Sequence, residues 1–204
     1  MVRALQKEIK REKLLGQGVS LLMGQGYHGT GLQEILDSVE IPKGSFYNYF
    51  GSKEKFCAEV IDHYIEPFIQ QLNVHLSNPD LDSLGALQVY FDELIDELER
   101  AEFKGGCLLG NLMGEIGDTS EICRTALKSA VKRYQDLLRS GLQKAQQEGR
   151  VRTDKSAGNM ADLLVNTWQG ALLRMKIEKS VEPLRECCQN LLGDYFISGL
   201  TDSD

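Results

Sequence analysis

Apolar residues recur every three or four positions along most of this 204-residue chain, the period of an amphipathic helix. Leu15, Val19 and Leu22 mark the first such run, and Gly24 follows it closely. Only four prolines occur, and glycine and proline fall mostly between the runs. The pattern predicts an all-α fold of about nine helices, at about 3–24, 30–39, 42–50, 52 into the seventies, 81–102, 107–116, 120–148, 153–179 and 180–198.

The last two predicted helices have more apolar surface than one core requires. The final helix carries a broad apolar stripe of Leu184, Cys187, Cys188, Leu191, Leu192, Tyr195 and Phe196. The helix before it has one stripe of Met160, Ala161, Leu164, Trp168, Ala171, Leu172 and Met175, and further apolar residues elsewhere at Leu163, Val165, Leu173 and Ile177. One face can line a core while another meets a second subunit, so we expect a homodimer formed through these two helices.

Composition is that of an ordinary globular protein, 42% hydrophobic and 26% charged, long enough for one large or two small domains. No run approaches the ~20 apolar residues of a membrane span, and the charged N-terminus lacks a signal-peptide pattern. We therefore expect a cytoplasmic protein with no membrane partner. The five cysteines are irregularly spaced and the three histidines unclustered, which predicts no disulfide framework, no metal site, no cofactor and no catalytic constellation.

Charge is divided unevenly along the chain. The net charge of −7, taken over the whole protein, argues against binding to nucleic acid. Residues 1–55, however, carry 8 basic and 6 acidic side chains, against 15 and 24 in residues 56–204. Because local charge steers binding to phosphates, the acidic body does not exclude DNA as a partner.

Residues 26–55 predict a helix-turn-helix unit. Thr30, with Gln33 three residues later, is typical of a capping box at the start of one helix. Pro42 opens a short second helix that ends before Gly51, and Ser52 caps the next. We therefore expect a DNA-binding domain over residues 1–52 and an effector-binding and dimerisation domain over 53–204.

The short helix has distinct inner and outer sides at ~100° per residue. Phe46 and Phe50 define the buried side, whereas the opposite side is centred on Asn48 with Gly44 and Ser45 beside it. Asparagine pairs with adenine and serine contacts bases or phosphates, while glycine lets the backbone approach the groove. A helix merely packed in a bundle explains the two phenylalanines, but one face cannot also bury Tyr47, Asn48 and Tyr49.

Further predicted DNA contacts surround this face. Tyr47 and Tyr49 on its flanks and Lys43 at its start can reach phosphates, and Lys43 can also reach a guanine edge. The helix starts at Thr30 and Lys53 present backbone amides with partial positive charge. A basic run at Lys7, Lys10, Arg11 and Lys13 suits either phosphate contact or a solvated face.

This stretch closely resembles the DNA-binding domain of the TetR family of bacterial repressors. The resemblance rests on Gly26-Tyr27 with Thr30, on residues 43–50 (KGSFYNYF) and on Ser52-Lys53-Glu54. It implies an all-helical homodimer that binds double-stranded operator DNA, an effector pocket in the body, and release of DNA when a small molecule fills that pocket. Many members have histidine where Asn48 stands, so the resemblance does not fix the base that Asn48 reads.

Two windows of the body, 105–109 and 171–184, resemble electrophile- and oxidant-responsive members of this family. The resemblance implies that Cys107 is the sensing cysteine and Lys176 its partner, although Met175 replaces the expected alanine. The local sequence is consistent with a sensing role for Cys107. This residue follows Gly105-Gly106 at a predicted helix start, where partial positive charge favours the reactive thiolate.

Two alternatives remain open from the sequence. In the first, Cys107 is a small apolar residue beside Leu108 and Leu109, and a non-reactive effector binds reversibly. An effector pocket among the middle helices is expected to use Trp168, Leu172, Met113 and Tyr90. In the second, the chain is a helical interaction or enzyme domain that contains a helix-turn-helix, which the lack of a catalytic constellation disfavours. No role is predicted for Cys57 or Cys123.

Overall fold

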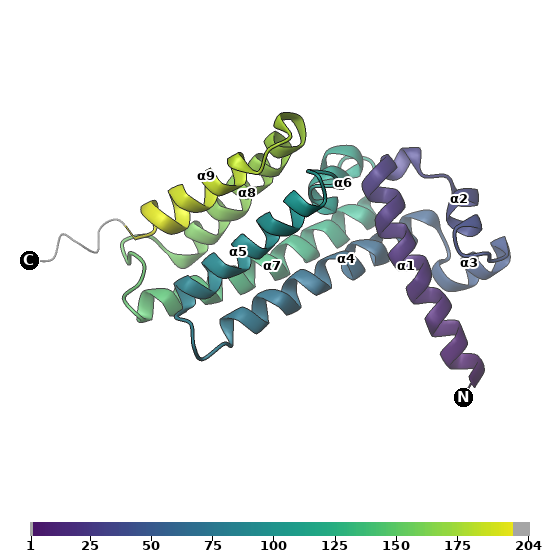
Figure 1. Cartoon of the computed structure of the whole chain (residues 1–204). Helices are drawn as coiled ribbons and strands as arrows, with labels where there is room; N and C mark the ends of the chain where they lie inside the picture. The colour runs from purple at the N-terminus through teal and green to yellow at the C-terminus, as the bar shows by residue number, and fades with distance from the viewer. Residues whose placement is uncertain (1, 198–204) are drawn as a thin grey trace, which may run out of the picture. The chain divides into compact units, whose positions relative to one another are not determined.

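The computed structural model of the chain describes residues 2–197, with side chains from residue 5 onward (Figure 1). Every regular element in this range is helical, which confirms the predicted all-α class. None of these helices is long and apolar enough to cross a membrane. The elements are α1 (Val2–Gly29), α2 (Leu32–Asp37), α3 (Lys43–Phe50), α4 (Lys53–Leu76), α5 (Ser83–Arg100), α6 (Leu108–Ile116), α7 (Glu121–Gln147), α8 (Ala157–Glu178), α9 (Glu182–Cys188) and a π-helix, η1 (Gln189–Tyr195).

The chain forms two compact units. Unit 1 comprises residues 1–67 and 107–131, and unit 2 comprises residues 68–106 and 132–204. Unit 1 therefore holds α1, α2, α3 and α6 together with the first parts of α4 and α7. Unit 2 holds α5, α8, α9 and η1 together with the remainders of α4 and α7.

An aromatic cluster forms much of the core of unit 1. The rings of Phe46, Phe50 and Phe56 lie with centroids 4.9–5.3 Å apart, which is favourable spacing for tilted and edge-on aromatic pairs. Helices α1 and α4 pack closely beside this cluster. Their close approach is seen at Gly18 of α1, where an added Cβ would lie only 2.6 Å from Phe56 and Val60 of α4. The same cluster fixes one side of α3 and leaves the other side for solvent.

Helix α8 supplies the centre of unit 2, packed against α9, and the two helices run side by side in Figure 1. Trp168 meets Phe91 of α5 with ring centroids 4.9 Å apart. The predicted inner stripe is buried throughout, and Val165, which was expected on another side, is buried as well. Leu163, Leu173 and Ile177 remain exposed.

The predicted cap at Thr30 is wrong. The Thr30 side chain is fully buried and its hydroxyl donates to the Gly26 carbonyl at 2.7 Å, within the kink where Gly26 has φ 74°. Gly31 instead precedes the first turn of α2, which begins at Leu32. The hydroxyl therefore stabilises the end of α1 rather than the start of α2.

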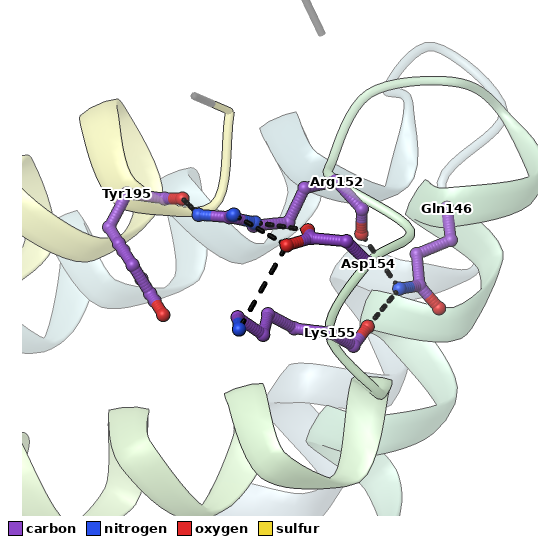
Figure 2. Close-up of polar contacts among 5 residues, drawn as sticks. All are labelled: Gln146, Arg152, Asp154, Lys155 and Tyr195. Atoms are coloured by element: carbon purple, nitrogen blue, oxygen red, sulfur yellow. Dashed lines mark hydrogen bonds and ion pairs between the residues drawn. The ribbon is translucent and has the colours of Figure 1, made fainter. Parts of the chain in front are cut away.

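Helix α8 begins later than the predicted start at Thr153-Asp154. Figure 2 shows the reason: Asp154 accepts two hydrogen bonds from Arg152, at 2.5 and 2.7 Å, and its carboxylate is thereby engaged. Ser156 caps α8 instead, accepting from the Asn159 amide at 3.1 Å. Arg152 also donates to the Tyr195 carbonyl at 3.2 Å, which ties this loop to the end of η1.

The last predicted helix changes type part-way. It is α-helical to Cys188 and a π-helix from Gln189 to Tyr195, and its predicted end near 198 lies outside the described residues. Leu184, Cys187, Leu191, Leu192 and Phe196 of the predicted stripe are buried, whereas Cys188 is half-buried and Tyr195 exposed.

Candidate DNA-binding and sensor sites

Helix α3 presents a polar, small-residue face to solvent. Lys43, Gly44, Tyr47 and Asn48 are exposed, and Ser45 and Tyr49 are half-buried at the margins. A Cβ on Gly44 would have no described heavy atom within 4 Å, so the backbone there is open to an approaching molecule. The face combines amide, hydroxyl and bare backbone groups, which suits contact with base edges and phosphates.

The basic residues of the run on α1 differ in their contacts and exposure. Arg11 pairs with Glu59 of α4 and lies 5.7 Å from the centroid of the Phe50 ring, so it is held within unit 1. Lys7 lies 5.5 Å from the centroid of Tyr49, beside the outward face of α3. Lys7, Lys10 and Lys13 are exposed, and only these three are available for phosphates.

The corner between α1 and α2 is held by Glu115 and Lys53. The carboxylate of Glu115 on α6 accepts from the amides of Tyr27 and His28 at 2.7 and 2.6 Å. The Lys53 ammonium donates to the Tyr27 carbonyl at 2.6 Å and lies 4.3 Å from the centre of the Tyr27 ring. The Lys53 side chain is thus turned inward, and any DNA contact by Lys53 must use its backbone amide. Thr30 is 0% exposed and contacts no DNA in this conformation.

Glu115 is a site residue that sequence reasoning missed. No motif marks it, because its role depends on α6 packing against α1, which brings together residues 88 positions apart. The close approach of Glu115 also explains Gly26, where a Cβ would lie 2.5 Å from a carboxylate oxygen in addition to facing a positive φ.

Cys107 lies where the sequence predicted, immediately before the first residue of α6. Its side chain is half-buried, and the two preceding glycines have φ of 83° and 78°. A Cβ on Gly106 would lie 3.2 Å from Cδ of Lys176, so the Lys176 stem passes against the residue next to Cys107. The direct pairing of Cys107 with Lys176 stays a prediction.

The residues predicted to line an effector pocket have different surroundings. Tyr90, Trp168 and Leu172 are buried in the core of unit 2, whereas Met113 on α6 is 40% exposed. A cavity of about 580 Å³ in unit 2 contains none of these four. It is lined by Gln88 and Asp92 of α5 and by Glu182, Arg185, Glu186, Cys188, Gln189, Asn190 and Gly193.

All five cysteines are free thiols, and two of them meet. The side chains of Cys57 on α4 and Cys123 on α7 interact, and both are fully buried. The two are 66 positions apart, so their spacing carries no sequence signal.

The three-helix head with its exposed polar helix, joined to a helical body, defines a DNA-binding transcriptional regulator. Residues 14–60 match the model of bacterial regulatory proteins of the tetR family, and residues 83–191 match the tetracyclin repressor-like C-terminal domain. The chain belongs to the TetR family of transcriptional repressors. The matched families and relatives are regulators, which confirms the prediction that it is not an enzyme.

Similar proteins align along most of the chain. The repressor DhaR of Mycobacterium sp. (strain GP1) is 34% identical over 174 residues, 85% of this chain and 86% of DhaR. The repressor NemR of Escherichia coli (strain K12) is 31% identical over 174 residues, 85% of this chain and 87% of NemR. The crystal structure of reduced E. coli NemR superimposes with a TM-score of 0.83 at 30% identity, covering 89% of this chain and 94% of that one. These relatives confirm a NemR-like body.

Proposed function

We propose that this protein is a cytoplasmic homodimeric repressor whose operator binding ends when a reactive electrophile or oxidant modifies Cys107. Residues 1–52 read the operator and residues 53–204 hold the effector site and the dimer contacts. The observation that carries the proposal is the polar outward face of α3, combined with a half-buried thiol at the start of α6.

In this proposal Asn48 and Ser45 contact base edges, and Gly44 lets the backbone of α3 approach the groove. Lys43, Tyr47 and Tyr49 contact phosphates and set the register of the helix, together with the amide of Lys53. Burial of Phe46 and Phe50 supports this assignment, because it fixes which side of α3 faces outward.

The exposed residues of α8 support a dimer. Leu163, Gly170, Leu173 and Ile177 fall within a sector of about 80° at the helical period, and Leu173 and Ile177 are 58% and 80% exposed. Exposed apolar surface of this kind is typical of a subunit interface. Two recognition helices carried by one dimer can bind the two halves of a palindromic operator.

Coupling between sensor and DNA is proposed to run through α6. Cys107 precedes this nine-residue helix, and Glu115 near its other end holds the amides of Tyr27 and His28 at the α1–α2 corner. A covalent change at Cys107 that shifts α6 would move Glu115 and disturb the corner from which α2 and α3 follow. The effector class is supported by the resemblance of the two body windows to electrophile-responsive members and by the likeness to NemR.

The test is operator release by N-ethylmaleimide and by hypochlorite, measured by fluorescence anisotropy on the promoter region of the protein's own gene. We expect release of the wild-type protein and resistance of Cys107→Ser. Cys188→Ser is the matched control, because Cys188 is the other half-buried cysteine. Equal release of wild type and Cys107→Ser by N-ethylmaleimide would exclude Cys107 as the sensor and indicate another cysteine, whereas no release of either protein would favour a reversible effector.

A further inference from the structure

A second thiol site lies in unit 1, away from Cys107 in the sequence and different in exposure. Cys57 stands on the first turns of α4, directly after the helix-turn-helix, and Cys123 stands on the first turn of α7. Both have 0% exposure. The Cys123 thiol donates to the carbonyl of Glu54, one turn before Cys57 on α4, at 3.6 Å, and the Cys57 and Cys123 side chains interact.

Polar groups surround this pair. Ser120 accepts from the Cys123 amide at 3.3 Å and donates to the Glu54 carboxylate at 2.8 Å. The hydrogen bond received from Cys57 lowers the pKa of the Cys123 thiol, while the same bond raises that of Cys57. Cys123 is therefore the thiol that ionises first, and the thiolate is the form that reacts with oxidants.

The pair also adjoins the corner that positions the recognition helix. Burial raises the pKa of the Tyr27 phenol to about 12, and the neighbouring Cys123, Glu54 and Cys57 add to the effect. Lys53 lies one helical turn before Cys57 on α4, and its positive charge offsets part of the rise in the pKa of the Cys57 thiol. The same ammonium donates to the Tyr27 carbonyl at 2.6 Å. Two reactive groups thus lie next to the residues that fix the α1–α2 corner.

We propose that Cys57 and Cys123 form a second redox site, a dithiol that small oxidants of the peroxide class convert into a disulfide that weakens operator binding. The weakening rests on the proposed repressor function, whereas the disulfide itself does not. Cys107 plays no part in this reaction.

The chemistry balances with hydrogen peroxide as the oxidant. The Cys123 thiolate attacks one peroxide oxygen, the O–O bond breaks, and hydroxide leaves and is protonated to water. The sulfur of Cys57 then attacks the resulting Cys123 sulfenic acid, the S–O bond breaks, and a second water leaves with the Cys57 proton. Two thiols lose two electrons and one peroxide becomes two waters.

Burial determines which reagents reach the pair. With both side chains at 0% exposure, reaction requires a local opening that admits a molecule as small as peroxide. We therefore expect oxidation to be slower than at half-buried Cys107, and we expect N-ethylmaleimide to leave both thiols unmodified in the folded protein. The pair would then respond to sustained oxidation after Cys107 has responded.

The effect on DNA follows from geometry. A disulfide holds its sulfurs about 2.05 Å apart, much closer than a hydrogen bond between thiols, so its formation draws α4 and α7 together at Cys57 and Cys123. Lys53 is one turn from Cys57 on α4, and Ser120 and Glu54 lie beside Cys123. We expect this to shift the Lys53 contact with Tyr27 and the corner it supports, which displaces α2 and α3 relative to α4.

The experiment uses the full chain carrying Cys107→Ser. The protein is treated with hydrogen peroxide, its remaining thiols are alkylated under denaturing conditions, and it is digested with trypsin. Cleavage at lysine and arginine places Cys57 in the peptide 56–100 and Cys123 in the peptide 105–124, where it is then the only cysteine. We expect these two peptides to appear linked in mass spectra, and dithiothreitol to separate them.

Operator affinity is measured on the same samples. We expect the linked fraction to bind about ten-fold or more weakly, the usual size of an allosteric coupling, and dithiothreitol to restore binding. Adding Cys57→Ala or Cys123→Ala should abolish both the link and the peroxide effect. Adding Cys187→Ala, which removes another buried cysteine, should abolish neither. If the alanine variants do not fold, the correlation of linked fraction with lost affinity over time in Cys107→Ser decides.

Two results would overturn the proposal: no linked peptide under peroxide concentrations that fully oxidise Cys107 in the wild type, or complete linkage with unchanged operator affinity. A reduced protein that binds no operator would instead contradict the repressor function. In that case the linked peptide still tests the redox site.

Discussion

Helices α3 and α8 each expose one face, and the two faces differ in the large aliphatic side chains that only α8 exposes. The outward face of α3 consists of polar and small residues, with Gly44, Tyr47 and Asn48 exposed. The outward face of α8 carries large apolar side chains, with Leu163, Leu173 and Ile177 exposed beside the polar Asn166. Each contains a glycine, Gly44 or Gly170, at which a Cβ would have no described heavy atom within 4 Å.

The difference indicates two kinds of partner. Polar groups and bare backbone are the means by which a helix recognises base edges and phosphates, whereas exposed leucine and isoleucine gain free energy only when another apolar surface covers them. Exposure alone therefore does not mark a functional face. The chemistry of the exposed groups determines whether the partner is nucleic acid or a second copy of the chain.

The largest expected effect comes from placing a charge on the α8 face. Ile177→Asp should convert a dimer into monomers, because a buried unpaired carboxylate is costly at an interface. Operator affinity should then fall by a factor of about 10² or more, since the second half-site is lost as an intramolecular contact. Analytical ultracentrifugation and anisotropy measure the two effects.

Val74→Asp is the matched control for this change. Val74 is 69% exposed and Ile177 is 80% exposed, so both substitutions place an acid at an exposed apolar position of a long helix. The control should remain dimeric. A dimeric Ile177→Asp protein would show that the α8 face is not the interface.

The next effect separates base reading from phosphate contact on α3. Asn48→Ala should weaken the preferred operator by about 1–3 kcal/mol and weaken sites altered at one base much less, because a bidentate contact carries discrimination. Tyr47→Phe removes only a hydroxyl and should weaken every site alike, by about 0.5–1.5 kcal/mol. Competition binding against single-base variants of the operator measures both. Uniform weakening by Asn48→Ala would assign it to the phosphates instead.

The fold and the α3 face were predictable from sequence because both are encoded locally. Phe46 and Phe50 are one turn apart, so the helical period alone placed them inward and Asn48 outward. Most helix ends were likewise found from nearby glycine, proline and serine. The exceptions, Thr30 and Asp154, have side chains engaged by groups that the local pattern does not reveal, the Gly26 carbonyl and the Arg152 guanidinium.

The remaining contacts depend on residues that folding alone brings together. Glu115 meets Tyr27, and Cys57 meets Cys123, across 88 and 66 positions. One sequence contains no spacing rule for such pairs, since the separation is set by how whole helices pack. Tyr90, Trp168 and Leu172 illustrate the same limit, because an apolar residue suits a core and a pocket equally well, and here all three are buried in unit 2.

The smallest expected effects come from replacing the glycine on each of the two exposed faces. Alanine replaces glycine in a helix with a gain of about 0.5–1 kcal/mol when nothing obstructs the new methyl group. Gly44→Ala and Gly170→Ala should therefore unfold at a denaturant concentration no lower than that of the wild type, with the smaller gain at Gly44 near the start of α3.

If DNA approaches α3 closely, Gly44→Ala must nevertheless weaken operator binding while leaving dimerisation unchanged. If a second α8 packs closely, Gly170→Ala must weaken the dimer. Gly16→Ala on α1, another exposed glycine with no described atom within 4 Å, should be stabilised without either loss. A Gly170→Ala protein that dimerises as tightly as the wild type would mean that the α8 faces meet through their leucine and isoleucine side chains and not through close backbone approach.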